Sequence, residues 1–200
     1  MALETGLSAD DKRELLRIAR ESVVAIVSGR KYSASHSGSQ ALNEKAGAFV
    51  TLHEKGELRG CIGFIDARLP VCEAVAETAA KAAASDPRFD AVTPSELEQI
   101  ELEISVLSPL KRVTDLEEII IGKHGVMVER GFYRGLLLPQ VATENGWSRD
   151  EFLKYSCMKA GLDGGCYKDA GTRISIFSAE VFSEKECGLI PDAGIGEESL

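Results

Sequence analysis

Two spacings of apolar residues divide the chain into expected helices and expected strands. Apolar side chains recur at helical intervals over residues 15–27, after a capping box that begins at Ser8 and before Gly29, a residue type that favours the end of a helix. The helical spacing returns over residues 69–83 and 152–160. We expect these segments to be amphipathic helices that bury their apolar stripes.

Alternation of apolar and polar residues marks the expected strands, and short glycine-containing connections join several of them into hairpins. The expected strands are residues 48–54, 57–65, 100–107, 126–130, 136–138, 172–177 and 179–183. Helices are inserted between hairpins here, whereas a parallel sheet would alternate single strands with helices. The pattern therefore predicts an α+β fold with a mainly antiparallel sheet and packed helices.

The second strand of the first expected hairpin combines a cysteine with two flanking glycines and an arginine just before it. Alternate side chains of a strand share a face. Leu58, Ile62 and Phe64 are therefore expected on one side of the strand, with Arg59 and Cys61 on the other.

Cys61 has two interpretations. Arg59 would favour the thiolate, which is the reactive form of cysteine, and Gly60 and Gly63 would then line a pocket for a ligand. Free cysteine is also among the most buried residue types, so Cys61 can equally be an inert member of a core strand whose glycines serve packing. The spacing leaves both interpretations open.

Three other residues are candidates for binding a ligand. Arg88 can contact an anion or a carboxylate, or it can form an ion pair that fixes its loop. Glu103 can face the cysteine as a base, or it can belong to a solvated sheet face. Gln140, which follows the strand over 136–138, can donate a hydrogen bond to a ligand.

His124 is the candidate for moving a proton. It lies in a loop between Gly122 and Gly125, where the backbone is free and its amides are exposed. Imidazole titrates near neutral pH, so His124 can act as a general acid or base. The alternative is a turn histidine with no partner.

Composition excludes some classes of function. A length of 200 residues allows one domain with a sizeable core, and the net charge of −9 argues against a nucleic-acid partner. No apolar run reaches the ~18 residues of a membrane span, and the N-terminus lacks the features of a signal peptide. We therefore expect a cytoplasmic protein that binds neither nucleic acid nor membrane.

The cysteines and histidines predict neither disulfides nor a metal site. The five cysteines are odd in number and contain no C-x-x-C, so reduced thiols are expected. The three histidines, at positions 36, 53 and 124, lack the spacing of a zinc site. No metal or cofactor is predicted.

The stretch Leu58–Gly63, L-R-G-C-I-G, resembles the hallmark of the AMMECR domain family, whose prokaryotic members are called AmmeMemoRadiSam system protein A. Further blocks match the family in the same order and extend the resemblance over roughly residues 12–184. These blocks are D-P-R-F at 86–89, T-P-S-E-L-E at 93–98, E-I-S-V-L-S-P at 103–109, I-G-K-H-G at 121–125, L-P-Q-V-A at 138–142 and K-A-G-L at 159–162.

The resemblance implies an α+β fold with a larger and a smaller lobe, and a cleft near the L-R-G-C-I-G stretch. We expect a single AMMECR domain over residues 1–187, with the lobe boundary undefined, followed by a flexible acidic tail over 188–200. The family name also implies association with a Memo-type protein and a radical SAM enzyme.

Two hypotheses of function follow. In the first, the cleft binds or processes a small molecule, with Cys61 as nucleophile or redox centre, Arg59 stabilising its thiolate or binding an anionic substrate, and His124 moving the proton. In the second, the chain is a non-catalytic binding or adaptor protein for the Memo-type protein and the radical SAM enzyme. The negative charge disfavours a third hypothesis, regulation through DNA contact.

Overall fold

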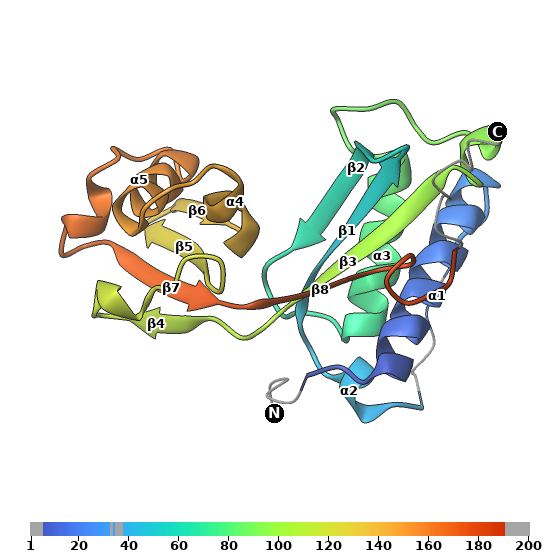
Figure 1. Cartoon of the computed structure of the whole chain (residues 1–200), viewed down its shortest axis with the longest axis horizontal. Coiled ribbons are helices and arrows are strands. Elements are labelled where there is room, and N and C mark those ends of the chain that lie inside the picture. Colours follow the sequence, from blue (N-terminus) through green and yellow to red (C-terminus); the bar gives the residue numbers. More distant parts are fainter. Residues whose placement is uncertain (1–5, 33, 35–37, 191–200) are drawn as a thin grey trace, which may run out of the picture. The chain divides into compact units, whose positions relative to one another are not determined.

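The computed structural model describes residues 6–32, 34 and 38–190. The chain divides into two compact units, the first formed by Met1–Val106 with Glu180–Leu200 and the second by Leu107–Ala179 (Figure 1). Each unit is described by itself below. Two expectations fall outside the described residues, namely His36 and most of the acidic tail, of which only residues 188–190 are included.

The first unit is a sheet covered by helices. Its strands are β1 (Gly47–Glu54), β2 (Glu57–Phe64), β3 (Ile100–Leu107) and β8 (Ala179–Ser183), in the spatial order β2-β1-β3-β8. Its helices are α1 (Ala9–Val27), α2 (Gln40–Asn43) and α3 (Val71–Ala84), with a 3-10 turn η1 (Pro94–Glu96) before β3. The helices α1 and α3 cover one face of this sheet (Figure 1).

Local signals in the sequence explain the ends of helix α1. Its N-cap Ser8 and Asp11 form the expected capping box, in which each side chain bonds the backbone N–H of the other residue. At the other end Gly29 adopts a φ of 69°, which a glycine accepts without strain and which ends the helix.

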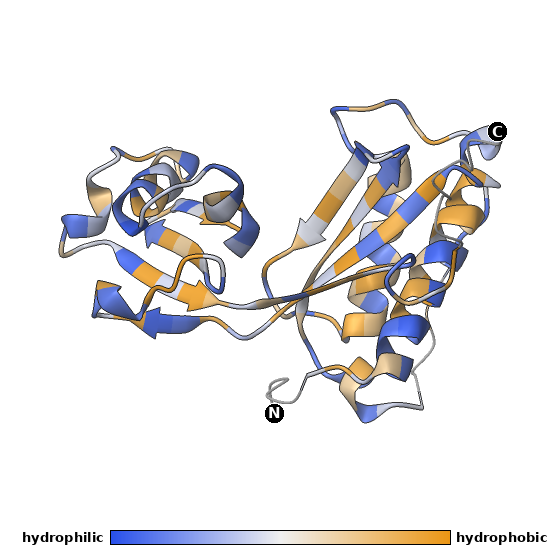
Figure 2. Cartoon of the chain, viewed as in Figure 1, coloured by the Kyte–Doolittle hydropathy of each residue, from blue (hydrophilic) through white to orange (hydrophobic). Residues whose placement is uncertain are grey.

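One face of the first sheet belongs to the core. Ala48, Val50 and Leu52 of β1 are fully buried against the helices, as are Leu102 and Ile104 of β3. Apolar and polar residues alternate along β3 as bands of colour in Figure 2. The intervening residues of β1 and β3 therefore lie on the opposite face of the sheet.

A bulge in β2 changes which side chains share a face. Leu52 pairs with Gly60 and His53 pairs with Leu58, so Arg59 is an extra residue without an opposite partner. The expectation that Leu58 shares a face with Ile62 was therefore wrong. Leu58 lies on the face of His53, whereas Ile62 pairs with Val50 on the core face.

The second unit has its own sheet and its own core. Its strands are β4 (Lys111–Val113), β5 (Gly125–Arg130), β6 (Tyr133–Leu137) and β7 (Arg173–Phe177), in the order β4-β7-β5-β6. Its helices are α4 (Pro139–Glu144) and α5 (Arg149–Lys159), with 3-10 turns η2 (Leu116–Glu118) and η3 (Cys166–Lys168). The two sheets are antiparallel, which confirms the predicted α+β class.

The hairpin of β5 and β6 is tighter than expected. Strand β6 begins at Tyr133, so only Gly131 and Phe132 connect the strands. The expected connection over 131–135 was therefore too long. Gly131 supplies the positive φ of 60° that such a short connection requires, and Tyr133 can then pair directly with Arg130.

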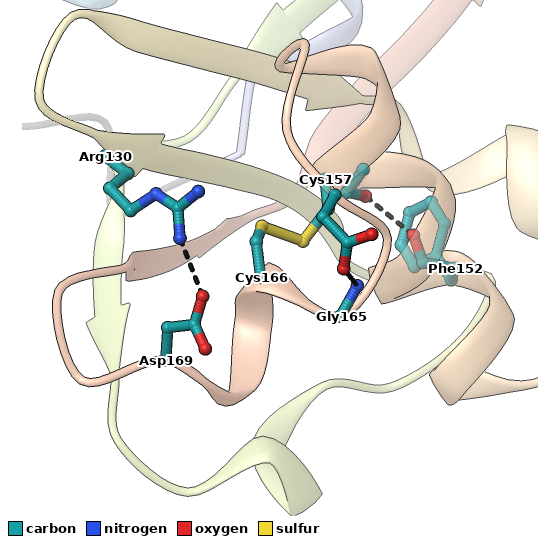
Figure 3. The surroundings of a disulfide bond; sticks show 8 residues. Arg130, Phe152, Cys157, Gly165, Cys166 and Asp169 are labelled. Carbon is teal, nitrogen blue, oxygen red and sulfur yellow. Dashed lines mark hydrogen bonds and ion pairs between the residues drawn. A yellow bond between two sulfur atoms is a disulfide. The ribbon is translucent and has the colours of Figure 1, made fainter.

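Cys157 and Cys166 form a disulfide that joins α5 to the turn η3 (Figure 3). Their Cα atoms are 6.0 Å apart, and both residues are buried. The expectation that all five cysteines are reduced thiols was therefore wrong, because counting cysteines does not show which of them the fold brings together. In the described part of the chain, no helix is long and apolar enough to cross a membrane.

Candidate functional site

Cys61 lies on the face of the first sheet that points away from the core. It pairs with Thr51 of β1, whose neighbours Val50 and Leu52 are buried. The hydroxyl of Thr51 donates to the Cys61 sulfur at 3.4 Å, and the Cys61 residue is only partly buried. The Cys61 side chain therefore lies outside the buried core of the first unit, with Thr51 as its hydrogen-bond partner.

Asp86 holds the backbone of Cys61 in place. Its side chain is only 2% exposed, and it accepts the Cys61 N–H at 2.8 Å. It also accepts the backbone N–H of Arg88 at 3.1 Å and the Arg88 side chain at 3.0 and 2.7 Å. The bonds from the Arg88 guanidinium, with those from the two backbone N–H groups, hold the pKa of Asp86 far below its ordinary value, although burial opposes the shift.

Arg88 binds the other backbone group of Cys61, its carbonyl oxygen. Its Nη2 donates to the Cys61 carbonyl oxygen at 3.2 Å as well as to Asp86, so Asp86 and Arg88 together hold both backbone groups of Cys61. Asp86 raises the pKa of Arg88, and the Cys61 side chain adds to the increase. The Arg88 guanidinium therefore lies next to Cys61.

Arg59 has other partners. Its Nε donates to Glu96 at 2.7 Å and its Nη1 donates to the Asp90 carbonyl oxygen at 2.9 Å. The bond from Arg59, followed by those from Thr93, lowers the pKa of Glu96 to about 2. Arg59 thus fixes the segment before η1 to strand β2, while the arginine that contacts Cys61 is Arg88.

Gly60 and Gly63 are enclosed by the protein itself. A Cβ on Gly60 would lie 2.4 Å from the carbonyl oxygen of Ala82 in α3. A Cβ on Gly63 would lie 2.1 Å from the ring of Phe49, its neighbour on β1. Both glycines therefore permit close packing around Cys61, and the space beside each one is already filled.

Glu103 shares the face of Cys61. It alternates along β3 with Leu102 and Ile104, which are in the core, and it is itself partly buried. Its carboxylate is therefore on the side of the sheet that also presents the Thr51 hydroxyl and the thiol.

His124 and Gln140 belong to the second unit. Nδ1 of His124 lies 3.2 Å from the backbone nitrogen of Ile120 and 3.1 Å from the carbonyl oxygen of Glu118, so it accepts the Ile120 N–H in one tautomer and donates to the carbonyl oxygen in the other. Gln140 lies in the first turn of α4, and its carbonyl oxygen accepts the Thr143 hydroxyl at 2.8 Å. The network around Cys61 is built from residues of the first unit alone.

Comparisons with known proteins identify the family. A family model described as AMMECR1 matches residues 16–182. The chain belongs to the AMMECR1 family. That match includes both the Cys61 network and the loop of His124.

The AMMECR1 relatives are archaeal proteins of similar length. The chain is 44% identical over 185 residues to a protein of Methanothermobacter thermautotrophicus, with 89% of this chain and 96% of that protein covered. It is 41% identical over 203 residues to Protein MK0488 of Methanopyrus kandleri, covering 97% and 96% of the two chains. The crystal structure of the uncharacterized protein PH0010 from Pyrococcus horikoshii matches with a TM-score of 0.78 at 38% identity, covering 86% of this chain and 90% of that one.

Sequence reasoning missed two members of this AMMECR1 network, Asp86 and Thr51. The D-P-R-F block drew attention to its arginine, but no local signal shows that its aspartate accepts the N–H of Cys61, 25 residues away. Thr51 pairs with Cys61 only because of the bulge at Arg59, since the tight connection at Lys55 and Gly56 would by itself place Val50 opposite Cys61. Among the residues that the structure describes, no group of three or more His, Cys, Asp or Glu side chains is arranged to hold a metal ion.

Proposed function

We propose that this AMMECR1-family protein binds or processes a small molecule at Cys61, which acts as a reactive thiol within a component of the AmmeMemoRadiSam system. The observation that supports this proposal is the setting of the thiol. It is partly exposed, it accepts the Thr51 hydroxyl, and it lies beside the Arg88 guanidinium. The cleft implied by the family resemblance and a cytoplasmic location are parts of the same proposal.

In this proposal the residues have distinct roles. Cys61 supplies the sulfur, Arg88 and Thr51 stabilise its anionic form, and Asp86 positions both Cys61 and Arg88. Glu103, on the same face, is a candidate to accept the thiol proton. Arg59 is a positioning residue, since its donors are directed to Glu96 and Asp90.

Roles for His124 and Gln140 also remain proposals. His124 would move a proton through Nε2, since Nδ1 is directed to the backbone of Glu118 and Ile120. A His124→Gln variant tests this role separately from the thiol, since it should slow turnover without altering alkylation of Cys61.

The test of thiol reactivity is alkylation of Cys61 by iodoacetamide, followed by peptide mass spectrometry over a range of pH. We expect Cys61 in the folded protein to react faster near neutral pH than in the unfolded chain, and we expect Arg88→Gln to slow the reaction. The same experiment reports on Cys72, which is fully buried and should be unreactive in the folded protein. A Cys61 as unreactive as Cys72 would contradict the proposal.

The second candidate function is an adaptor for a Memo-type protein and a radical SAM enzyme. It is favoured by the exposure of Phe132 (106%) and Tyr133 (57%) at the β5–β6 hairpin, because exposed aromatic residues are typical of protein interfaces. Binding of a purified Memo-type protein should weaken in Phe132→Ser and remain unchanged in Val181→Ser, which alters an exposed apolar residue of the first unit. Equal binding by both variants would argue against this surface.

A further inference from the structure

The ion pair of Asp86 and Arg88 is asymmetric in its exposure. The Asp86 side chain is 2% exposed, whereas the Arg88 side chain is 53% exposed. The buried carboxylate is already bonded by the Cys61 N–H and by three donors of Arg88. The pair therefore presents its positive end to solvent, next to Cys61.

The guanidinium of Arg88 retains one nitrogen for a ligand. Its Nε and Nη2 donate to Asp86, and Nη2 also donates to the Cys61 carbonyl oxygen. Nη1 makes none of these hydrogen bonds. Because Nη1 carries two N–H groups, it can bond the oxygen atoms of an anion without disturbing the contacts that hold Cys61.

Arg59 does not offer a second such donor. Its side chain is 14% exposed, its charge is paired with Glu96, and its Nη1 already donates to the Asp90 carbonyl oxygen. The ring of Phe89 lies 5.4 Å from the guanidinium carbon of Arg88 and 6.0 Å from that of Arg59. The ring of Phe89 thus packs against both guanidinium groups. Of the two arginines, Arg88 is the one that presents its charge to solvent.

These observations define the class of ligand. The formal charges of Arg59, Arg88, Asp86 and Glu96 sum to zero, and a single guanidinium faces solvent. A bound dianionic phosphate would therefore leave this cluster with a net charge of −2 and a bound carboxylate with −1, so a single exposed guanidinium favours the singly charged carboxylate.

We propose that Nη1 of Arg88 binds the carboxylate of a small substrate and so directs its reactive carbon to the sulfur of Cys61. This inference rests on the proposed function, because it assumes that Cys61 is the reacting group. It predicts that small carboxylates are favoured over neutral molecules of the same shape.

Iodoacetate and iodoacetamide provide a matched pair of probes. In both reactions the Cys61 thiolate attacks the methylene carbon, an S–C bond forms, the C–I bond breaks, and iodide leaves; the thiol proton has passed to solvent. The ratio of the two rates at Cys61, iodoacetate over iodoacetamide, is measured by peptide mass spectrometry. The same residue in the urea-unfolded chain provides the reference ratio.

We expect the ratio in the folded protein to exceed the reference about fivefold, as one partly exposed ion pair allows. It should decrease as salt is added. Arg88→Gln should return the ratio to the reference, and Arg88→Lys should retain part of it. Arg68→Gln, which removes an arginine that is 80% exposed and paired with Asp66, should leave the ratio unchanged.

The outcomes separate this inference from the proposed function. If Cys61 reacts with iodoacetamide but shows only the reference ratio in the wild type, the carboxylate site is wrong and the reactive thiol stands. If Cys61 reacts with neither reagent until the chain is unfolded, the proposed function fails. The wild-type measurements decide both points even if Arg88→Gln does not fold.

Discussion

At the scale of single residues, Asp86 connects the segment after α3 to strand β2. Its buried carboxylate accepts the N–H groups of Cys61 and Arg88 in addition to the Arg88 side chain. An asparagine at this position would keep the size of the side chain but lose its charge and one acceptor oxygen. Hydrogen bonds to charged groups contribute more to stability than neutral ones, so the substitution removes strong contacts.

We therefore expect Asp86→Asn to lower the free energy of unfolding by roughly 2 kcal/mol. Urea unfolding monitored by circular dichroism measures this change. Asp90→Asn is the matched control, since it removes an exposed carboxylate of the same loop and should change stability by less than about 0.5 kcal/mol. Equal effects of the two substitutions would show that the Asp86 contacts do not stabilise the fold.

Glu96 makes stability depend on pH. Its pKa is about 2 in the folded protein, against the ordinary 4.5, because Arg59 and Thr93 bond its carboxylate. A lowered folded pKa contributes stability above the unfolded pKa, and this contribution is lost as pH falls toward the folded pKa. Between about pH 5 and about pH 2, wild type should lose roughly 2 kcal/mol more than Glu96→Gln.

Unfolding in urea at a series of pH values measures the difference. Glu98→Gln removes an exposed carboxylate two positions away and should follow the wild-type curve. If the wild-type and Glu96→Gln curves were parallel, Glu96 would titrate alike in the folded and unfolded states, and the ion pair with Arg59 would have no role in acid stability.

Sequence patterns identified several residues of this network but not their partners. Cys61, Arg59 and Arg88 stand out because of their chemistry or their motif, and Thr93 and Glu96 have the spacing of a capping box, which the structure contains. Glu96 also binds Arg59, which is 37 residues away in the sequence. This contact forms because the loop before η1 folds back to strand β2, and local sequence patterns do not predict that path.

At the scale of elements, the glycines of β2 determine how closely the strand approaches its neighbours. Gly60 faces a backbone carbonyl of α3, whereas Gly63 faces the side chain of Phe49. A helix backbone cannot move aside without repacking, but a partly buried aromatic ring can turn. The two glycines should therefore tolerate an added methyl group to different degrees.

We expect Gly60→Ala to lower the free energy of unfolding by about 1–3 kcal/mol, and Gly63→Ala to lower it by less. Gly171→Ala is the control, because a Cβ at that position would meet nothing within 4 Å. Urea midpoints of the purified variants measure the order. A larger loss for Gly63→Ala would contradict the assignment of α3 as the rigid neighbour.

The bulge at Arg59 shows why the faces of a strand are harder to predict than the strand. The glycines and the hairpin length indicated β1 and β2 almost to the residue. The alternation of faces expected from the sequence runs through position 59 without a break. In the structure one extra residue at that position places Leu58 on the other face. The bulge is defined by pairing across the sheet, which periodicity within one strand does not report.

At the scale of the whole molecule, the two units have separate cores and are stabilised differently. The first core contains the apolar faces of α1 and α3, and the second contains residues of α5 with β5 and β7. The α+β class followed from the order of hairpins and helices. The disulfide in the second unit did not, because its two cysteines come together only when the segment after α5 folds back.

The disulfide should stabilise the second unit selectively. Cys157 and Cys166 enclose a short loop, and closing a loop of this size contributes about 2–3 kcal/mol in the chain-entropy account. Near the disulfide, Arg130 also binds Asp169 at 2.6 Å, so η3 is attached at two points (Figure 3). Reduction removes the covalent attachment and leaves an ion pair between exposed side chains, which contributes little.

Hydrogen exchange with and without dithiothreitol tests this argument on the intact chain. Exchange should increase over residues 161–171 and remain unchanged in α1 and α3, which belong to the other unit. The double variant Cys157→Ala/Cys166→Ala should behave like the reduced protein, and Cys187→Ser, which alters a free cysteine, should behave like the oxidised one.

Thiol titration of the unfolded chain should find three thiols before reduction and five after it. Five thiols before reduction would show that the bond is absent, and faster exchange in α1 or α3 would show that the two units are not stabilised independently.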